Sequence, residues 1–188
     1  MEKIKNTNKS EKISEVLLSK KAKYIIGTVL LSGIGIALPR IFHVLAGSSA
    51  GAIFLPMHIA VLIAALTFGI SSSLIVAITS VGFSYLLTGM PSLARFPYML
   101  AELIIYSVLL GLFNKKYNYY ISLIMTIIIG RILYAVMLLV ATDIFGFSTY
   151  GITVFESVKM SILGIILQLV TIPVIAKFMN ERLNLKNE

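Results

Sequence analysis

Long apolar runs alternate with short polar breaks along this chain, and the pattern predicts a bundle of transmembrane helices. Crossing the ~30 Å hydrocarbon core of a bilayer takes about 20 mostly apolar helical residues. Six runs approach that length, at residues 24–39, 53–70, 72–89, 96–113, 117–141 and 156–176. We therefore expect an all-α integral membrane protein with six transmembrane helices.

The polar residues outside these runs define the expected organisation. Residues 1–23 form a basic amino-terminal segment, residues 24–178 the six-helix membrane domain, and residues 179–188 a polar tail. The connections at residues 40–52 and 144–155 are rich in Gly, Ser and Thr. These boundaries leave no room for a separate soluble domain.

Composition agrees with a membrane protein. Of the 188 residues, 58% are hydrophobic and 13% are charged, whereas soluble domains carry roughly 25% charged residues. The sequence contains no Cys, which excludes disulfides, thiolate catalysis and Cys-ligated metals.

The positions of the basic residues predict the orientation in the membrane. Twelve of the sixteen Lys and Arg residues fall in the two terminal segments and in the break after residue 113. The opposite side holds only Arg40, Arg95 and Lys159. Cytoplasmic segments carry the excess of Lys and Arg, so both termini are expected in the cytoplasm. The net charge of +8 is thereby explained without a nucleic-acid partner.

Two charged residues lie well inside predicted spans, Glu102 and Arg131. An acid at the centre of a span costs about 2.5–3.5 kcal/mol on insertion scales, and such residues usually mark functional sites. Tyr98, Glu102 and Tyr106 recur every four residues and therefore share one helix face. Tyr134 lies one turn from Arg131 on its own helix.

In the expected orientation, these polar side chains all fall in the outer half of the membrane. The predicted binding residues are His58, Arg95, Tyr98, Glu102, Arg131 and Tyr134. The inner half is almost wholly apolar, which favours an outward-facing pocket over a through-pore, since a pore needs polar groups at every depth. A purely structural Glu102–Arg131 pair that braces the bundle is the alternative.

Two small-residue segments have predicted roles of other kinds. Gly47-Ser-Ser-Ala-Gly51 matches the hydrolase G-x-S-x-G pattern, which needs a strand-to-helix turn and a positioned base. Because it lies in a break between spans, we expect a gating loop with Arg40, His43, Gly47 and Gly51, and no catalytic residue. Gly33 and Ala37 form a small-x-x-x-small pair that lets another helix approach closely.

Several local strings resemble a known family. These are Pro39-Arg-Ile-Phe-His43, Phe54-Leu-Pro-Met-His58, Thr88-Gly-Met-Pro91, Met99-x-x-Glu102-Leu-x-x-Tyr106 and Gly130-Arg-x-x-Tyr134. Together with six short helices and a polar outer half, they resemble the substrate-binding S component of energy-coupling factor (ECF) vitamin transporters. The resemblance covers roughly residues 24–178 and is closest to a branch that includes proteins assigned to α-ribazole, a cobalamin precursor.

This resemblance implies a transport subunit of the bacterial cell membrane. Such a subunit binds a vitamin from outside and associates with a transmembrane coupling protein and two ATPases. The family's docking surface is a small-residue pattern on the first span, which Gly33 and Ala37 would match with Gly in place of the first Ala. The chain lacks G-x-x-x-x-G-K-[ST], so ATP hydrolysis would fall to the partners.

The resemblance and the composition also set expectations about cofactors. Nickel and cobalt S components use an amino-terminal Met-His, whereas this chain begins Met1-Glu2-Lys3. Two separated His residues without Cys make a poor transition-metal site. No metal and no other cofactor is expected.

We also considered three other classes of membrane protein. A scaffold of the MreD type has a similar size and would bind no small molecule. An intramembrane enzyme would need paired carboxylates, H-E-x-x-H or a serine dyad, none of which the sequence offers. A solitary secondary transporter would need polar residues in the inner half. For a vitamin-binding subunit, α-ribazole is the first expectation, with riboflavin, pantothenate or a pyridoxine-like ring as runners-up.

Overall fold

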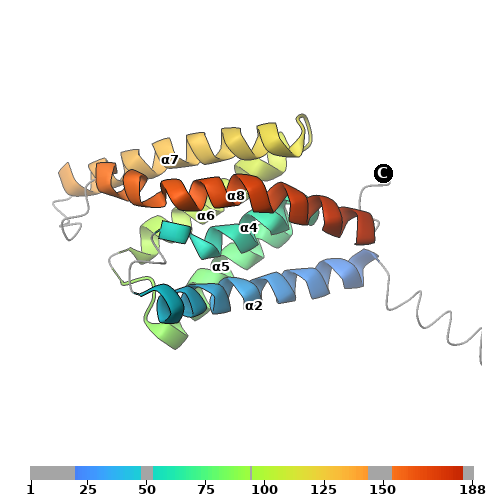
Figure 1. Cartoon of the computed structure of the whole chain (residues 1–188), viewed down its shortest axis with the longest axis horizontal. Helices are drawn as coiled ribbons and strands as arrows, with labels where there is room; N and C mark the ends of the chain where they lie inside the picture. Colours follow the sequence, from blue (N-terminus) through green and yellow to red (C-terminus); the bar gives the residue numbers. More distant parts are fainter. Residues whose placement is uncertain (1–19, 48–52, 94, 144–153, 184–188) are drawn as a thin grey trace, which may run out of the picture.

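The computed structural model describes residues 20–47, 53–93, 95–143 and 154–183. Every regular element within these ranges is an α-helix (Figure 1). In chain order the helices are α2 (Lys20–Ala46), α4 (Pro56–Thr67), α5 (Gly69–Thr88), α6 (Phe96–Phe113), α7 (Tyr119–Asp143) and α8 (Val154–Leu183). The predicted all-α class and the six apolar helices are confirmed for the part of the chain that is described.

Five of the six helices are long and apolar enough to span a membrane. Large apolar side chains are exposed along them, including Ile26 on α2, Leu86 on α5, Ile128 on α7 and Val170 on α8. Exposed apolar surface on this scale favours lipid over water as the surrounding medium. The chain is accordingly a multi-pass membrane protein.

Helix α4 differs from the prediction of a full second span at residues 53–70. It has 12 residues, or about 18 Å at 1.5 Å per residue, which is too short for the ~30 Å hydrocarbon core. Pro56 begins the helix, and Phe68 and Gly69 (φ 82°) end it. Thus the second apolar run yields a short internal helix.

Helix α4 is the centre of the bundle. It packs against α2, α5, α6 and α8, and every α4 residue except Ile59 is buried. The core built around it includes Leu62 and Leu66 of α4, Leu103 of α6 and Leu123 of α7. A helix enclosed in this way can be apolar on all sides, which explains why its sequence resembles a span.

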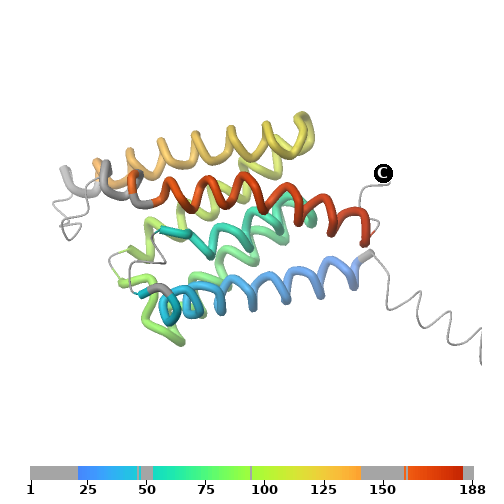
Figure 2. Tube along the Cα trace, in the orientation of Figure 1, coloured from blue at the N-terminus to red at the C-terminus, as the bar shows by residue number. Residues whose placement is uncertain are grey.

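The chain passes back and forth along the bundle, as Figure 2 traces. The beginning of α2 and the end of α8 lie at the same end, at the right of Figures 1 and 2. There the Lys23 ammonium donates to the Leu183 carbonyl at 3.0 Å. We refer to this as the terminal end of the bundle, and to the opposite end, which carries Arg40 and Arg95, as the distal end.

Two helices extend beyond their predicted limits. Helix α2 continues through Pro39 to Ala46, so Arg40 and His43 lie on a helix and not in the predicted loop. Helix α8 continues through Pro173 to Leu183, so the predicted polar tail begins as helix. Apolar residues with helical spacing continue on both sides of each proline, and helices packed in a bundle tolerate the one hydrogen bond that a proline removes.

The first and third predicted spans pack very closely. A Cβ atom on Gly35 of α2 would overlap the Ser80 side chain of α5. Near this contact, the Thr79 hydroxyl of α5 donates to the Ser32 hydroxyl of α2 at 2.9 Å. Small and hydroxyl-bearing residues bring these helices together, as is typical of membrane proteins.

Candidate functional site

Three ionisable side chains from three helices meet inside the bundle. Glu102 of α6 lies between His58 of α4 and Arg131 of α7. The His58 Nε2 atom is 3.2 Å from Glu102 Oε2, and Arg131 Nη1 is 3.1 Å from Glu102 Oε1. We call these three residues the polar cluster. The sequence predicted them as binding residues at similar depth, and the structure brings them into direct contact.

All three side chains are shielded from the surface. The exposed fractions are 1% for the His58 side chain, 4% for Glu102 and 12% for Arg131. At such burial, charges attract more strongly than at the surface, but each one has also lost its hydration. The carboxylate is therefore held from two sides by partners that the fold has to place accurately.

The start of α4 positions His58. Leu55, directly before the helix, is buried and has a left-handed backbone (φ 49°). This conformation costs a non-glycine residue roughly 1–2 kcal/mol, and it turns the chain so that Pro56 can begin the helix. The His58 N–H then donates to the Leu55 carbonyl at 3.0 Å. Strained backbone next to a buried polar side chain is common at functional sites.

Tyr106 completes the surroundings of the cluster. It lies one turn after Glu102 on α6 and is 1% exposed. Its ring packs edge-on against the His58 ring, with centroids 5.4 Å apart, which fixes the imidazole plane. The sequence placed Tyr106 on the Glu102 face, but nothing in the pattern predicted its contact with His58.

Gly130 of α7 makes room for Tyr106. A Cβ atom at position 130 would overlap the Tyr106 ring. The residue directly before Arg131 therefore determines how closely α7 approaches α6. On the same α7 face, Thr126 and Ser122 are completely buried, so small side chains continue the close packing towards the terminal end.

Arg131 uses only part of its guanidinium in the ion pair. Its Nη1 atom faces Glu102, while the Nε and Nη2 atoms are buried and find no hydrogen-bond acceptor among the described residues. The Tyr134 ring lies 5.9 Å from the guanidinium carbon, which is within the range of a cation–π contact. A guanidinium has five N–H donors in a fixed fork, so one edge of this fork is available to a further molecule.

The other predicted binding residues lie apart from the cluster. Arg95 is exposed at the start of α6, and Tyr98 is partly buried one turn further on. Neither has a described contact with the polar cluster. Both lie at the distal end of α6, closer to the distal end of the bundle than Glu102.

The predicted gating residues are at the distal end too, on a different element. Arg40 is exposed and His43 partly buried on the last turns of α2, and Gly47 (φ 83°) follows the helix. Gly51 lies outside the described residues. Gly33 and Ala37 are exposed on the outer surface of α2, and a Cβ atom on Gly33 would meet nothing within 4 Å.

Sequence reasoning did not single out Gln168, which the structure shows to be a buried polar residue. It is 1% exposed on α8, and its amide Nε2 atom finds no acceptor among the described residues. One turn earlier, Gly164 packs against the backbone of Ile53 and Phe54. Because α4 and α8 run in the same direction (Figure 1), Gln168 lies at about the level of His58. A lone Gln within a predicted span was the available signal, since polar residues there usually face the bundle interior.

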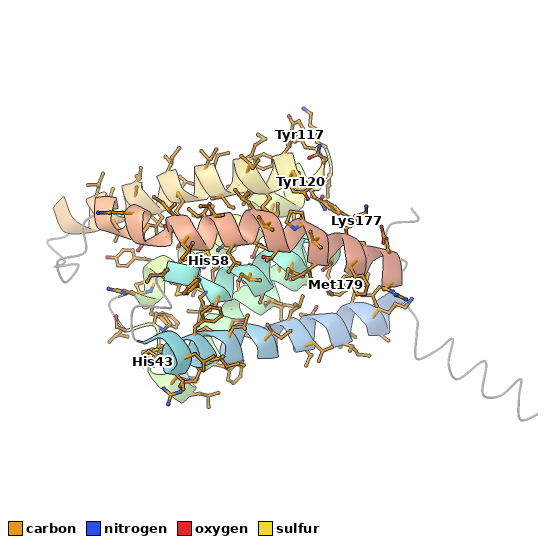
Figure 3. All side chains as sticks on the ribbon, in the orientation of Figure 1. His43, His58, Tyr117, Tyr120, Lys177 and Met179 are labelled. Atoms are coloured by element: carbon orange, nitrogen blue, oxygen red, sulfur yellow. The ribbon has the colours of Figure 1, made fainter. Side chains whose placement is uncertain are left out.

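The polar cluster lies nearer the distal end of the bundle. In Figure 3, His58 appears in the half that contains His43, whereas Lys177 and Met179 mark the terminal end. Glu102 follows the distal start of α6 by about 9 Å at 1.5 Å per residue. The terminal half also contains buried polar side chains, among them Thr67, Ser73 and Asn180, and Asn114 and Asn180 donate to the Leu66 carbonyl. The sequence-based prediction of an almost wholly apolar inner half is therefore too strict.

The polar cluster combines one carboxylate with two basic side chains and neighbouring aromatic rings. Among the described residues, no group of three or more His, Asp or Glu could hold a metal ion. Both oxygens of the single carboxylate already face a basic partner. What the site offers to another molecule is N–H donors and aromatic rings.

Comparison of the chain with known protein families, with curated proteins and with solved structures finds no match. The interpretation of the site therefore rests on its residues and their geometry.

Proposed function

We propose that this chain is the substrate-binding S component of an ECF-type importer in a bacterial plasma membrane. In this role it binds a vitamin or vitamin precursor from outside, at the polar cluster. It then delivers the molecule through a coupling module driven by ATP. The chain itself is a transport subunit and not an enzyme.

The observation that carries the proposal is the buried contact of His58, Glu102 and Arg131, in which one edge of the guanidinium has no acceptor within the described part of the chain. A purely structural brace would satisfy its own donors, because each buried unpaired polar group costs about 1–3 kcal/mol. An unsatisfied donor edge beside the Tyr134 ring is instead what a ligand with polar atoms and a flat ring would complete.

The position of the cluster supports binding from one side. The polar residues lie nearer the distal end, and Arg40, His43 and Gly47 lie at the same end. With most basic residues at the terminal end, the positive-inside rule assigns the distal end to the exterior. A molecule arriving from outside would thus meet the half of the bundle that contains the site.

The outer surface of α2 supports docking of a membrane partner. Gly33 and Ala37 are exposed on it and have small side chains. A transmembrane coupling protein could approach the α2 backbone closely at this surface, because small residues permit short interhelical distances. Two ATPase subunits attached to that protein would supply the energy.

Uptake experiments test this function directly. Cells that produce the chain together with a coupling protein and two ATPases would be given labelled α-ribazole first, and then riboflavin, pantothenate and pyridoxine. We expect uptake of one of these compounds that is lost when the P-loop lysine of the ATPases is replaced by alanine, since the bound molecule cannot be released without that energy.

The same experiment separates the other classes of function. Uptake that persists with inactive ATPases would identify a secondary transporter. No uptake of any compound, with the chain co-purifying with cell-wall machinery instead, would favour a scaffold of the MreD type.

A further inference from the structure

We propose that uncharged acceptor atoms anchor the ligand. Two adjacent acceptors would receive hydrogen bonds from the Nε–Nη2 edge of Arg131, and Gln168 would be an additional donor. This inference rests on the proposed function and specifies its substrate class. The class is an uncharged heterocycle or nucleoside that presents paired acceptors, such as a carbonyl oxygen beside a ring nitrogen or a vicinal diol. Molecules that present a carboxylate or phosphate to the site are excluded from it.

Three buried donor atoms in the described part of the bundle lack an acceptor. Arg131 Nε, Arg131 Nη2 and Gln168 Nε2 are buried nitrogen atoms without an acceptor among the described residues. Arg131 nitrogens can only donate, and an amide nitrogen also only donates. Hence the atoms that these groups lack are acceptors, and a ligand rich in oxygen or unprotonated ring nitrogen would supply them.

The charges within the polar cluster also bear on the charge of the ligand. The negative charge of Glu102 and the positive charge of Arg131 are in contact and cancel, and a neutral imidazole can still donate its Nε2–H to the carboxylate. With the imidazole in this neutral form, the three side chains carry no net charge before any ligand arrives. An anionic ligand group would leave one uncompensated negative charge within the membrane-spanning part of the bundle, where such charges are strongly disfavoured.

The guanidinium of Arg131 also has a geometry that suits paired acceptors. Nε–H and one Nη2–H of a guanidinium point in parallel from one edge, so they match two adjacent acceptors in a plane. Arginine reads the O6 and N7 atoms of guanine in this bidentate way. Because Nη1 is held by Glu102 and Tyr134 flanks the guanidinium, the orientation of this edge is fixed before binding.

Matched pairs of probes that differ in charge test the inference. Binding to the detergent-purified full chain would be measured by titration calorimetry with α-ribazole and its phosphate, riboflavin and flavin mononucleotide, and pantothenol and pantothenate. For the pair that binds, we expect the uncharged member to bind at least about tenfold more tightly. Equal or tighter binding of the charged member would overturn the inference and leave the proposed function intact. No binding of any probe would contradict the proposed function itself.

Two variants test the named donors with the probe that binds. Arg131→Lys keeps the charge opposite Glu102 but has no bidentate edge, so we expect affinity to fall roughly 10- to 100-fold. Gln168→Met keeps the size of the side chain and removes the amide, and we expect a weaker loss of several-fold. Arg182→Lys, on the exposed last turn of α8, is the matched control and should bind as the wild type does. Unchanged affinity in both Arg131→Lys and Gln168→Met would overturn the inference.

Discussion

Glu102 contacts His58 and Arg131 next to a hydrophobic core. Such a buried group is a poor device for stability, since the cost of removing charges from water offsets most of their attraction. Apolar residues of similar size would brace the helices at least as well. This imbalance is one physical reason for proposing that the cluster binds a ligand.

A double-mutant comparison tests whether the cluster is dispensable for folding. Arg131→Met alone leaves the Glu102 charge buried and should lower the free energy of unfolding by about 3–5 kcal/mol. Adding Glu102→Gln removes that charge, so the double variant should recover most of the loss. Denaturant titration of the detergent-purified protein measures both values.

Exposed residues provide the control for this comparison. Arg182→Met removes an equal charge from the exposed end of α8 and should change the unfolding free energy by less than about 1 kcal/mol. A double variant that is as unstable as Arg131→Met alone would show that the ion pair is structurally required, which is the alternative interpretation of these residues.

At this scale the sequence predicted which residues are unusual but not all of their contacts. Charges within apolar runs identified Glu102 and Arg131, because the membrane makes such charges costly. The contact of His58 with Glu102 depends on the left-handed backbone at Leu55. This conformation could not be predicted from the sequence, because Leu rarely adopts it. Gln168 was visible in the sequence, but its burial opposite α4 depends on how α8 packs.

Helix α4 is the element that places His58 beside Glu102 within the bundle. Being short and enclosed, it brings His58 near the level of Glu102 without reaching the distal surface. Its apolar composition cannot be distinguished from that of a lipid-facing span by pattern alone, because both lack a polar face. The sequence therefore predicted the number and order of the helices and could not predict that the second one is internal.

A single substitution can test the contact between helices α6 and α7. In Gly130→Ala, the new methyl group would overlap the Tyr106 ring and push α7 away from α6. We expect a loss of about 1–3 kcal/mol in unfolding free energy, as is typical of overpacked cores. We also expect weaker ligand binding, since Arg131 moves with α7 and the ring that fixes His58 is displaced.

Gly82 offers a matched control for this substitution. It lies within helix α5, and a Cβ atom there would meet nothing within 4 Å. Gly82→Ala should therefore leave stability unchanged or slightly improved. Equal behaviour of Gly130→Ala and Gly82→Ala in thermal unfolding and in binding would contradict the role given to the α6–α7 contact.

In the whole molecule, the beginning of α2 and the end of α8 lie together at the terminal end of the bundle, and the polar cluster lies nearer the distal end. Basic residues on described elements follow the same division, with Lys21, Lys116, Lys177 and Arg182 at the terminal end. Counting charges along the sequence predicted a common side for both termini, and the beginning of α2 and the end of α8 do lie together. The cytoplasmic location of that side is still a prediction from the positive-inside rule.

Cysteine labelling tests this orientation in a chain that has no Cys of its own. Ser92 is exposed between α5 and α6 at the distal end, and Lys116 is exposed between α6 and α7 at the terminal end. A membrane-impermeant maleimide should label Ser92→Cys in intact cells, and Lys116→Cys only after permeabilisation. The reverse pattern would place the polar cluster on the cytoplasmic side and contradict uptake from outside.

The central claim is that the polar cluster holds a small molecule, and mass spectrometry of compounds released from the detergent-purified chain tests it most directly. The wild type and Arg182→Met should release one vitamin-like compound in stoichiometric amount. The charge-balanced Glu102→Gln/Arg131→Met variant, which should stay folded, should release none. Retention of the same compound by the folded double variant, or an empty wild-type protein with no thermal shift against any vitamin tested, would contradict the account.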